Sequence, residues 1–361
     1  MRLAIDVREA CSSMRTGKGQ WCYGFVGEIL RRGIPVRLLS DRPPPAHWLA
    51  HANVSAAVLS STGWRWHIHA MREIVRHPDA VYVSPTSYIV PAFASRSVRC
   101  IPVVHDMIAF RGEPHDRRAT IIERALLGRA LRRAAHGCTV SDATRTDLLR
   151  RFPHLPPERI TPIFAGLPWG TPAQRDPQDG VVLCIGTLCP RKNQLRLIEA
   201  FARLPDAVRE RSALVLIGGR GWHDDAIVHA ARSTPSVKWM EYLSDAACVD
   251  ALQRCAVFAL PSLYEGFGLA VLDALARGIP TLTSDRGSLR EVAGEAALVV
   301  DPENTLSIRD GLARLLTDAS LRTTLARRGM EQARMFSWAR TVDLFLGAVA
   351  SIDNAAQSGE R

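Results

Sequence analysis

The chain has 361 residues and a formal net charge of +10, with 47% hydrophobic and 23% charged residues. This length favours two domains, and the composition is that of a folded globular protein rather than a disordered chain. No uninterrupted apolar run approaches the roughly 18 residues of a membrane-spanning helix, and MRLAIDV predicts a buried first strand rather than a signal peptide. The eight cysteines are scattered with no CxxC pair, which predicts reduced thiols in a cytosolic protein and no zinc site.

Positive charge is concentrated in the first half of the chain. Residues 1–170 hold 24 Lys and Arg against 13 Asp and Glu, whereas the remainder holds 22 against 23. This asymmetry indicates an anionic partner: nucleic acid, an anionic membrane surface or a phosphorylated substrate. Nucleic acid is disfavoured, because the sequence contains no basic patch interleaved with aromatic residues and no known binding motif.

Short apolar segments alternate with helical patterns along the chain. This order predicts an α/β protein with parallel sheets covered by helices, in two successive doubly wound units. The Pro- and Gly-rich residues 166–180 predict a linker between them. In such folds ligands bind beyond the carboxyl ends of the strands. The expected strands are residues 2–7, 36–39, 81–84, 101–106, 181–186, 213–218, 255–261, 281–284 and 297–301, and the expected helices include Trp21–Arg32, Asn193–Leu204, Ala246–Arg254, Leu269–Arg277 and Thr305–Thr317.

A glycine-containing segment, Arg15-Thr-Gly-Lys-Gly-Gln20, follows the first expected strand. Gly17 and Gly19 let backbone N–H groups approach a ligand, and the N-terminus of the next helix favours a phosphate. The segment is neither a complete GxGxxG motif nor a P-loop, so an ordinary strand-to-helix turn is an equally good interpretation.

A polar pair, His105 and Asp106, ends the buried strand IPVV. This position is typical of ligand-binding residues in open α/β sheets. The alternatives are that Asp106 caps the following segment and that His105 is an ordinary surface group.

Two adjacent cations, Arg191 and Lys192, follow the first strand of the second unit in the segment GTLCPRKN, which begins at Gly186. At a strand-to-helix junction they could reach a diphosphate, Arg as a bidentate fork and Lys as a point charge. The alternative is a solvated basic pair.

The most informative segment is PSLYEGFGLAVLDALARG, residues 261–278. Gly266 and Gly268 predict a tight turn into a helix whose free N–H groups can hold a phosphate. Glu265 precedes the turn and Asp273 lies about a turn and a half into the helix. Two carboxylates placed in this way could accept hydrogen bonds from hydroxyls at separate points of one extended ligand, although each alone could be a solvent-facing charge.

These segments together resemble the retaining family 4 glycosyltransferases. Residues 261–278 resemble the family's E-x7-E signature, TGKGQW its amino-terminal glycine loop, VVHD its histidine–aspartate site and IGTLCPRKN its diphosphate-binding loop. VSDATRTDLLRRF, SLREVAGEAALVVDP and RMFSWART resemble further stretches, so that the likeness covers nearly the whole chain in the family's order.

The resemblance implies the GT-B fold, with two Rossmann-like domains facing each other across a cleft. Residues 1–165 would form the acceptor-side domain, 181–335 the nucleotide-sugar domain, and 336–361 a helix that packs back towards the N-terminal domain. The implied catalytic residues are His105, near the transferred sugar, Arg191 and Lys192, on the diphosphate, and Glu265, on the sugar hydroxyls. The implied nucleotide-sugar contacts are Gly17, Gly19, Asp106, Gly186, Thr187, Gly266, Phe267, Gly268 and, at the ribose, Asp273.

The chain departs from the family pattern at two positions. Asp273 stands where the family has a second Glu, which puts the contact with the ribose in doubt because the side chain is one methylene shorter. Thr187 stands where many relatives have an arginine, which leaves the charge to Arg191 and Lys192. The GTxxPRKN form resembles a mannosyltransferase-rich branch and favours GDP-mannose as the donor.

The implied reaction transfers a hexose with retention and without a bound metal or other cofactor. The expected acceptor is a glycan or a polyprenyl-pyrophosphate-linked oligosaccharide, used in the cytoplasm for cell-surface polysaccharide synthesis. Residues Arg117–Arg133 predict a helix with an apolar inner face and a basic outer face. The inner face comprises Ile121, Ile122, Ala125, Leu126, Ala130 and Leu131, and the outer face comprises Arg117, Arg118, Arg124, Arg129, Arg132 and Arg133. That outer face either rests on an anionic membrane or is simply solvated.

Three other functions fit the sequence less well. The first is a hexosyltransferase that uses a UDP-sugar. The second is a GT-B enzyme of another reaction type, such as a sugar-nucleotide epimerase or a phosphorylase. The third is a non-catalytic subunit that binds nucleotide sugars, and donor-dependent product formation would distinguish it from an enzyme.

Overall fold

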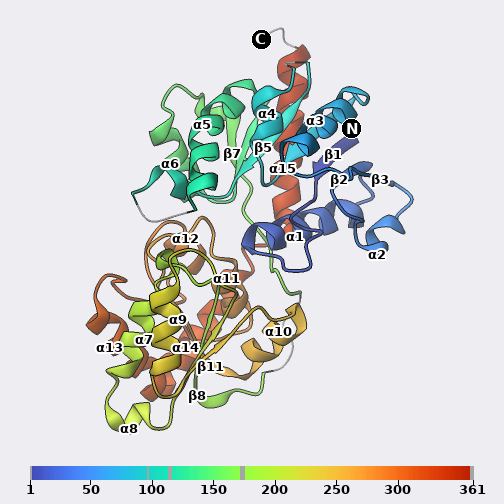
Figure 1. Ribbon diagram of the computed structural model, residues 1–361. Helices are drawn as coiled ribbons and strands as arrows, with labels where there is room; N and C mark the ends of the chain where they lie inside the picture. The colour runs from blue at the N-terminus through green and yellow to red at the C-terminus, as the bar shows by residue number, and fades with distance from the viewer. Residues whose placement is uncertain (1, 96, 113–115, 171–174, 358–361) are drawn as a thin grey trace. The chain divides into compact units, whose positions relative to one another are not determined.

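The computed structural model describes residues 2–95, 97–112, 116–170 and 175–357 (Figure 1). Within these residues the chain divides into two compact units. The first combines the described residues of 1–111, 117–166 and 337–361, and the second those of 112–116 and 167–336. The predicted linker, 166–180, contains this boundary. The linker is shorter than predicted, because Gln178–Gly180 already belong to a strand. Residues 171–174 of the predicted linker lie outside the described part of the chain.

The first unit contains a parallel sheet in the order β3-β2-β1-β4-β5-β6-β7. The chain winds outward from β1 in one direction and from β4 in the other, so the switch point lies between these two strands. The strands are β1 (Arg2–Asp6), β2 (Val36–Ser40), β3 (Val54–Val58), β4 (Ala80–Ser84), β5 (Cys100–Val104), β6 (Gly137–Thr139) and β7 (Ile160–Pro162), and the helices are α1 (Gly17–Arg31), α2 (Ala46–Leu49), α3 (Gly63–Val75), α4 (Ile89–Phe93), α5 (Arg117–Arg133), α6 (Asp142–Arg151) and α15 (Trp338–Gln357), with short 3-10 turns at Ile108–Phe110 and Pro157–Arg159.

The second unit repeats this plan with the strand order β10-β9-β8-β11-β12-β13, also parallel. Its switch point lies between β8 and β11. The strands are β8 (Gln178–Ile185), β9 (Ala213–Ile217), β10 (Val237–Met240), β11 (Cys255–Leu260), β12 (Thr281–Thr283) and β13 (Leu298–Val299), and the helices are α7 (Gln194–Ala202), α8 (Asp206–Arg209), α9 (Asp225–Ser233), α10 (Asp245–Arg254), α11 (Leu269–Ala276), α12 (Leu289–Ala293), α13 (Thr305–Thr317) and α14 (Ala319–Ala333), with a 3-10 turn at Pro190–Lys192.

The central strands are buried on both faces because helices cover each sheet. In β4 and β5 all five residues are buried, and β11 is buried except at Ala256. Polar residues cap several helix starts: the Ser141 hydroxyl accepts the Thr144 N–H at α6, and the Asn304 side chain accepts two N–H groups at α13. These apolar strands and capped helices produce the predicted fold class.

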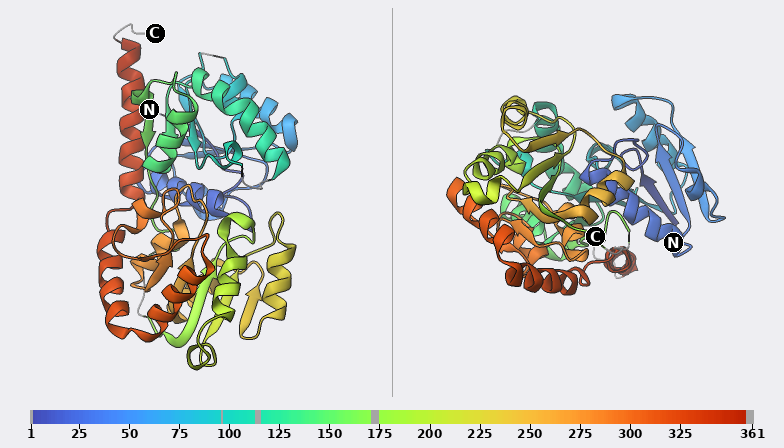
Figure 2. Two further views of the ribbon diagram at one scale, coloured as in Figure 1. Left: turned by 90° about the vertical axis from the view of Figure 1, so that its left-hand side faces the viewer. Right: turned by 90° about the horizontal axis from the view of Figure 1, so that it is seen from below.

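Helix α15 belongs to the first unit (Figure 2). Its first residue, Trp338, packs so closely on α1 that a Cβ added at Gly24 would lie 2.1 Å from the Trp338 ring. The Phe25 and Phe345 rings also meet edge to face, with centroids 5.1 Å apart. The segment Ala319–Ile352 is long and apolar enough to cross a membrane by length and composition. In the structure it forms two helices, α14 against α11 and α15 against α1.

Helix α5 differs from the prediction. Ile121 and Ile122 are 67% and 45% exposed, and Ala125 is also exposed. The prediction of an inner apolar face was wrong for these residues and is confirmed for Ala130 and Leu131, because all the buried positions of α5 lie in its second half, from residue 127 to 131. Three of its arginines are not simply solvated, since their guanidinium groups donate hydrogen bonds to backbone carbonyls; they are Arg124, Arg129 and Arg133.

Candidate functional site

Three of the predicted catalytic residues meet in the second unit. The Glu265 carboxylate accepts a hydrogen bond from Arg191 Nη1 at 2.8 Å and another from Lys192 Nζ at 2.6 Å. Ser262 Oγ donates a third, to Glu265 Oε1, at 2.7 Å. Arg191 also donates to the Tyr264 carbonyl at 2.7 Å. The cluster therefore carries two cations around one carboxylate, which leaves a formal charge of +1.

The electrostatics of this cluster hold Glu265 in its ionised form. Burial raises the pKa of Glu265, but the charges of Arg191 and Lys192 and the hydrogen bonds from Lys192 and Ser262 outweigh burial, so that the pKa falls to about 2. At neutral pH Glu265 is thus an acceptor of hydrogen bonds and not a proton donor.

The switch point of the second sheet brings these side chains together. Arg191 and Lys192 follow β8, and Glu265 follows β11, its neighbour in the sheet. Asn193 fixes the first loop: its backbone is left-handed (φ 61°), and its side-chain amide donates to the carbonyls of Pro261 and Pro302. Ligands of doubly wound sheets bind at this position.

The predicted glycines and their neighbours line the same two loops. Gly186 directly follows β8 with φ 157°, and a Cβ there would touch the side chain of Lys192 at 3.4 Å. Thr187 follows, and its carbonyl accepts a hydrogen bond from Gln194 Nε2 at 3.0 Å. Gly268 (φ 97°) is the N-cap of α11, and the loop reaches it from Glu265 through Gly266 and the buried Phe267. The first turn of α11, whose N–H groups have no partner within the helix, therefore starts a few residues after Glu265 of the cluster.

In the first unit, His105 is buried at the end of β5. Its Nε2 lies 2.7 Å from the Pro85 carbonyl, and its ring meets Trp21 edge to face. Burial and the charge of Lys18 lower the pKa of His105 to about 3, so the ring is neutral. A carbonyl oxygen only accepts, so the proton is assigned to Nε2, which leaves Nδ1 as an acceptor.

A second ion pair lies near this histidine, between Lys18 Nζ and Glu123 Oε1 at 3.4 Å. Asp106 turns back to accept the Ile108 N–H at 3.1 Å, as its capping alternative predicts. Helix α1 begins at Gly17 and not near Trp21, so that Gly17 and Gly19 are part of its first turn rather than of a preceding loop. Gly19 has no room for a side chain, because a Cβ would lie 2.7 Å from the Glu9 carbonyl.

Comparisons with known proteins agree with the fold. The model "Glycosyltransferase Family 4" matches residues 16–168, and "Glycosyl transferases group 1" matches residues 172–332. O-antigen chain mannosyltransferase B of Escherichia coli is 34% identical over 282 residues, which cover 73% of this chain and 72% of that protein. The chain is a family 4 glycosyltransferase.

Solved structures resemble this glycosyltransferase over nearly its whole length. Sucrose-phosphate synthase from Thermosynechococcus elongatus matches with a TM-score of 0.77 at 16% identity, covering 99% of this chain and all of that one. HepE of Anabaena, in complex with UDP and glucose, also has a TM-score of 0.77 at 16% identity and covers 97% of this chain and all of its own. At these identities the likeness establishes the GT-B fold alone.

Asp273 of this glycosyltransferase lies in a different environment from Glu265. It is fully buried, and its Oδ2 accepts a hydrogen bond from Arg277 Nε at 2.6 Å. Arg277 in turn donates to the carbonyl of Trp169, whose indole N–H bonds to Asp245. Burial raises the pKa of Asp273, and the pair with Arg277 opposes that rise. Contact between Asp273 and a ribose remains a prediction, and it requires that the buried carboxylate become accessible.

Sequence reasoning missed several residues that support the site. Ser288 donates from its backbone N–H and its hydroxyl to the Glu265 carbonyl, and neighbouring Gly287 leaves no space for a Cβ. Neither residue carries a local signal, because its role depends on a loop more than twenty positions away. The pair of Asp273 with Arg277 did have a signal, since opposite charges four residues apart face each other on a helix. Among the described residues, no group of three or more His, Cys, Asp or Glu side chains is arranged to hold a metal ion.

Proposed function

We propose that the enzyme transfers mannose, with retention, from GDP-mannose to a glycan or a lipid-linked oligosaccharide in cell-surface polysaccharide synthesis. The observation that carries the proposal is the cluster of Arg191, Lys192 and Glu265 at the switch point of the second sheet. The mannosyl donor is supported by the GTxxPRKN segment and by the relative named O-antigen chain mannosyltransferase B.

The charges of the cluster suit a diphosphate leaving group. When the bond between the sugar C1 and the phosphate oxygen breaks, its electron pair remains on the diphosphate. Arg191 and Lys192, already held in place by Glu265, stabilise that charge without reorganisation. The acceptor oxygen forms the new bond to C1 on the same face, and its proton passes to the departing phosphate oxygen, so no protein base takes part.

The remaining groups orient the sugar. Ionised Glu265 accepts hydrogen bonds from sugar hydroxyls, and the neutral ring of His105 offers Nδ1 as another acceptor. Because the two cations carry the leaving-group charge, we propose that the reaction needs no metal ion. Retention of turnover in the presence of EDTA is the expected result.

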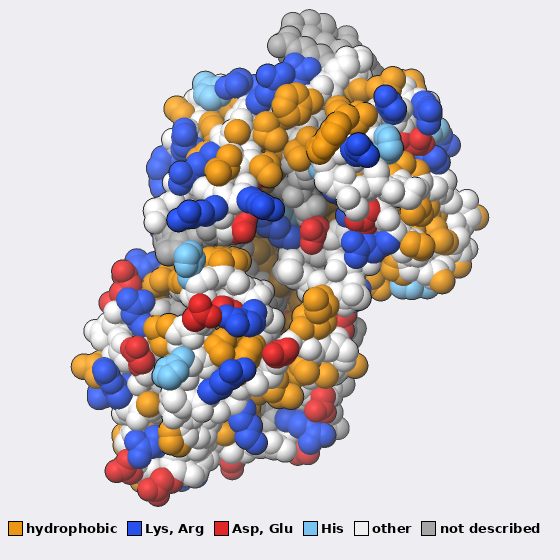
Figure 3. Space-filling view, viewed as in Figure 1, with side chains coloured by type: hydrophobic (Ala, Val, Ile, Leu, Met, Phe, Trp, Pro, Cys, Tyr) orange, Lys and Arg blue, Asp and Glu red, His pale blue; other side chains and the backbone are white. Residues whose placement is uncertain are grey.

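We further propose that the enzyme works in the cytoplasm at the inner face of the membrane. The outward isoleucine Ile121 lies one helical turn from the exposed Arg117 and Arg118. Figure 3 shows basic and apolar side chains interspersed over the first unit. Such a mixed surface favours anionic lipid. Co-sedimentation with anionic vesicles that falls as salt rises is expected, and indifference to lipid charge and salt would contradict this part.

A UDP-sugar is the second candidate donor, because HepE of Anabaena, with the same fold, was solved with UDP and glucose. Thermal unfolding with GDP, UDP and ADP, and with their common sugar nucleotides, separates the candidates. A ligand at 100 times its Kd adds about 2.7 kcal/mol to the free energy of unfolding. Stabilisation by GDP supports the proposal, and stabilisation by UDP alone overturns the mannosyl donor.

Product analysis tests the reaction itself. The enzyme with GDP-mannose and an oligosaccharide acceptor is expected to form a product whose new linkage has the anomeric configuration of the donor. An inverted linkage contradicts retention. Nucleotide binding without any donor-dependent product favours the non-catalytic alternative.

A further inference from the structure

A surface groove of the first unit lies at the end of its sheet that is opposite to the ligand-binding edge. The groove has a volume of about 450 Å³ and is lined by the last turns of α3, the end of α4 and the residues just before β5. Because these segments precede β4 and β5, they lie at the amino ends of the strands, whereas ligands of doubly wound sheets bind at the carboxyl ends. None of the site residues predicted from the sequence lines the groove.

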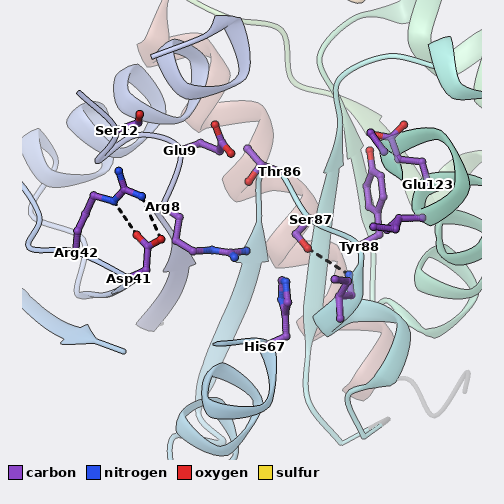
Figure 4. Close-up of a pocket in the computed structure, with 13 residues that line it drawn as sticks. Arg8, Glu9, Ser12, Asp41, Arg42, His67, Thr86, Ser87, Tyr88 and Glu123 are labelled. Carbon is purple, nitrogen blue, oxygen red and sulfur yellow. Dashed lines mark hydrogen bonds and ion pairs between the residues drawn. The ribbon is translucent and has the colours of Figure 1, made fainter. Parts of the chain in front are cut away.

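A cavity at the carboxyl ends of the same sheet has a different character (Figure 4). Residues that follow β1 and β4 line it, together with His67 of α3 and Glu123 of α5. Its lining carries charges of both signs, since Arg42 pairs with Asp41 at 2.9 and 3.2 Å and Glu9 is a further acidic residue. This cavity belongs to the ligand-binding edge of the unit. The groove is therefore a separate surface, at the other end of the strands.

The floor of the groove is apolar and closely packed. Ile74, Ala94 and Val98 are each at most 9% exposed, and they belong to the buried core that α3 and α4 form with the sheet. The rim is also apolar, but it is open to solvent, because Val75 is 61% and Phe93 is 52% exposed. A fixed hollow with exposed apolar edges is typical of a surface that binds a partner.

Positive charge surrounds the groove. Arg72 and Arg76 line it, and among the described residues no Asp or Glu does. Arg72 is exposed and makes no ion pair or side-chain hydrogen bond within the described part of the chain. Arg76 shares the carboxylate of Glu73 with Arg37, at 3.3 and 2.6 Å, and one carboxylate does not neutralise both guanidinium groups. The groove therefore keeps an excess of positive charge.

Helix α5 holds two further cations beside the groove. The Arg129 guanidinium lies over the Phe93 ring, 5.0 Å from its centroid, and its Nε donates to the Ala92 carbonyl at 2.8 Å. Arg133 donates to the Ala94 carbonyl at 2.6 Å. A carbonyl fixes a guanidinium group without cancelling its charge, so both cations can still attract an anion. Figure 3 shows basic side chains around apolar ones over this part of the first unit, where Figure 1 labels α3 and α4.

We propose that the groove binds an acidic amphipathic helix of another protein. Such a helix presents apolar side chains at i, i+3, i+4 and i+7, which fill the hollow, and carboxylates on its flanks, which meet the arginines. A second copy of the chain is a poorer match, because residues 1–170 hold 24 Lys and Arg against 13 Asp and Glu, so two such grooves repel each other. A membrane surface favours apolar side chains that project from a helix face, whereas this floor is recessed and a guanidinium covers the Phe93 ring. Because the groove lies at the amino ends of the strands, a bound helix leaves the ligand-binding edge free.

Fluorescence anisotropy with the full chain tests the proposal. The probes are labelled helical peptides of about 18 residues, or five turns, with Leu or Phe on the i, i+3, i+4 and i+7 face and Glu at the other positions. Matched peptides carry Lys in place of every Glu. The acidic peptides are expected to bind, more weakly as the salt concentration rises, and the basic peptides are expected not to bind. Failure of every acidic peptide to bind would overturn the proposal, as would equal binding of acidic and basic peptides.

Exposed positions allow the groove to be altered without disturbing the core. Val75→Asp is expected to weaken binding of the acidic peptides about tenfold or more, because the new charge is buried against the apolar face of the peptide. Arg72→Glu is expected to weaken it about fivefold, the upper scale of one exposed ion pair. Trp64→Asp and Arg65→Glu are the matched controls: both residues are exposed on α3 outside the groove lining, and both variants should bind like the native chain. An equal loss in the control and groove variants would overturn the proposal.

Two further measurements distinguish the other occupants. Val75→Asp is expected to co-sediment with phosphatidylglycerol vesicles as the native chain does, and light scattering is expected to give the same mass for both. Vesicle binding or self-association that is lost in Val75→Asp, with peptide binding kept, would overturn the proposal in favour of a lipid or a second copy. Sugar transfer and the thermal midpoint of Val75→Asp are expected to equal those of the native chain, so the result does not depend on the donor.

Discussion

Replacing Glu265 by Gln removes the negative charge that holds Arg191 and Lys192 and keeps the shape of the side chain. Because the pKa of Glu265 is about 2 against an ordinary 4.5, ionisation stabilises the folded state by about 3 kcal/mol at neutral pH. Glu265 is 5% exposed, so solvent screens little of this term. Since Gln resembles the protonated acid, Glu265→Gln is expected to lose about this amount.

The pH dependence follows from the direction of the shift. A carboxylate whose pKa is lowered by folding contributes its full stability above its unfolded pKa, and this stability is lost as the pH falls towards the folded pKa. The difference between the native chain and Glu265→Gln should therefore be constant from pH 7 to about 5. It should fall to about three quarters of that value at pH 4 and to about half or less at pH 3.

Urea unfolding at pH 7, 5 and 4 measures this difference. Glu241→Gln is the matched control: its side chain is exposed in the same unit, and a change within about 0.5 kcal/mol is expected. Glu265→Gln should also gain more stability from inorganic pyrophosphate than the native chain, because its two cations are no longer neutralised. A loss below about 1 kcal/mol, or one that grows as the pH falls, would refute the electrostatic account.

Four further predictions concern single positions. Lys192→Ala should lower turnover about 100-fold or more, the scale of one lost preorganised charge contact, and near-normal turnover would remove it from the mechanism. Gly287→Ala should cost about 2 kcal/mol or more in urea unfolding, because φ is +62° and the new Cβ would meet a carbonyl oxygen at 2.2 Å. Arg277→Met should cost about 3–5 kcal/mol by leaving the buried Asp273 unpaired, and adding Asp273→Asn should recover much of that loss. His105, whose pKa is lowered to about 3, should destabilise the fold as the pH falls below about 6.5, so His105→Gln should show a flatter decline of thermal midpoint between pH 7 and 5.

The fold could be predicted because its central strands are apolar runs. β1, β4, β5, β8 and β11 are buried and rich in branched residues, so they were recognised directly. β6 and β7 have three residues each, too few for a pattern, and the edge strands β3 and β10 contain no fully buried residue, so none of the four was predicted. The start of α1 was placed too late because Gly17 and Gly19 suggest a turn, whereas here they occupy the first turn of a helix.

The candidate site could be predicted where the chemistry lies in contiguous motifs. Two loops carry these residues: Arg191 and Lys192 follow β8, and Glu265 follows β11. The two loops are side by side because they lie at the switch point of the sheet. The ion pairs join side-chain atoms that lie 2.6–2.8 Å apart but belong to residues more than seventy positions apart in the sequence. No motif encodes these contacts. The burial of the Asp273 side chain also depends on packing between distant elements. The same holds for His67, whose buried Nδ1 has no hydrogen-bond partner within the described residues.

The last helix of the chain has a consequence for how the protein is made. Trp338 fills the space beside Gly24 and Gly166, and α15 packs on α1, so the first unit is completed by residues synthesised after the second unit. Residues 1–166 alone leave the aromatic face of α1, with Trp21 and Phe25, without its cover. Domains usually fold in order as they emerge from the ribosome. Here the second unit can finish folding while the first waits for α15, and shortened chains that end before residue 338 are expected to expose an apolar surface and to aggregate.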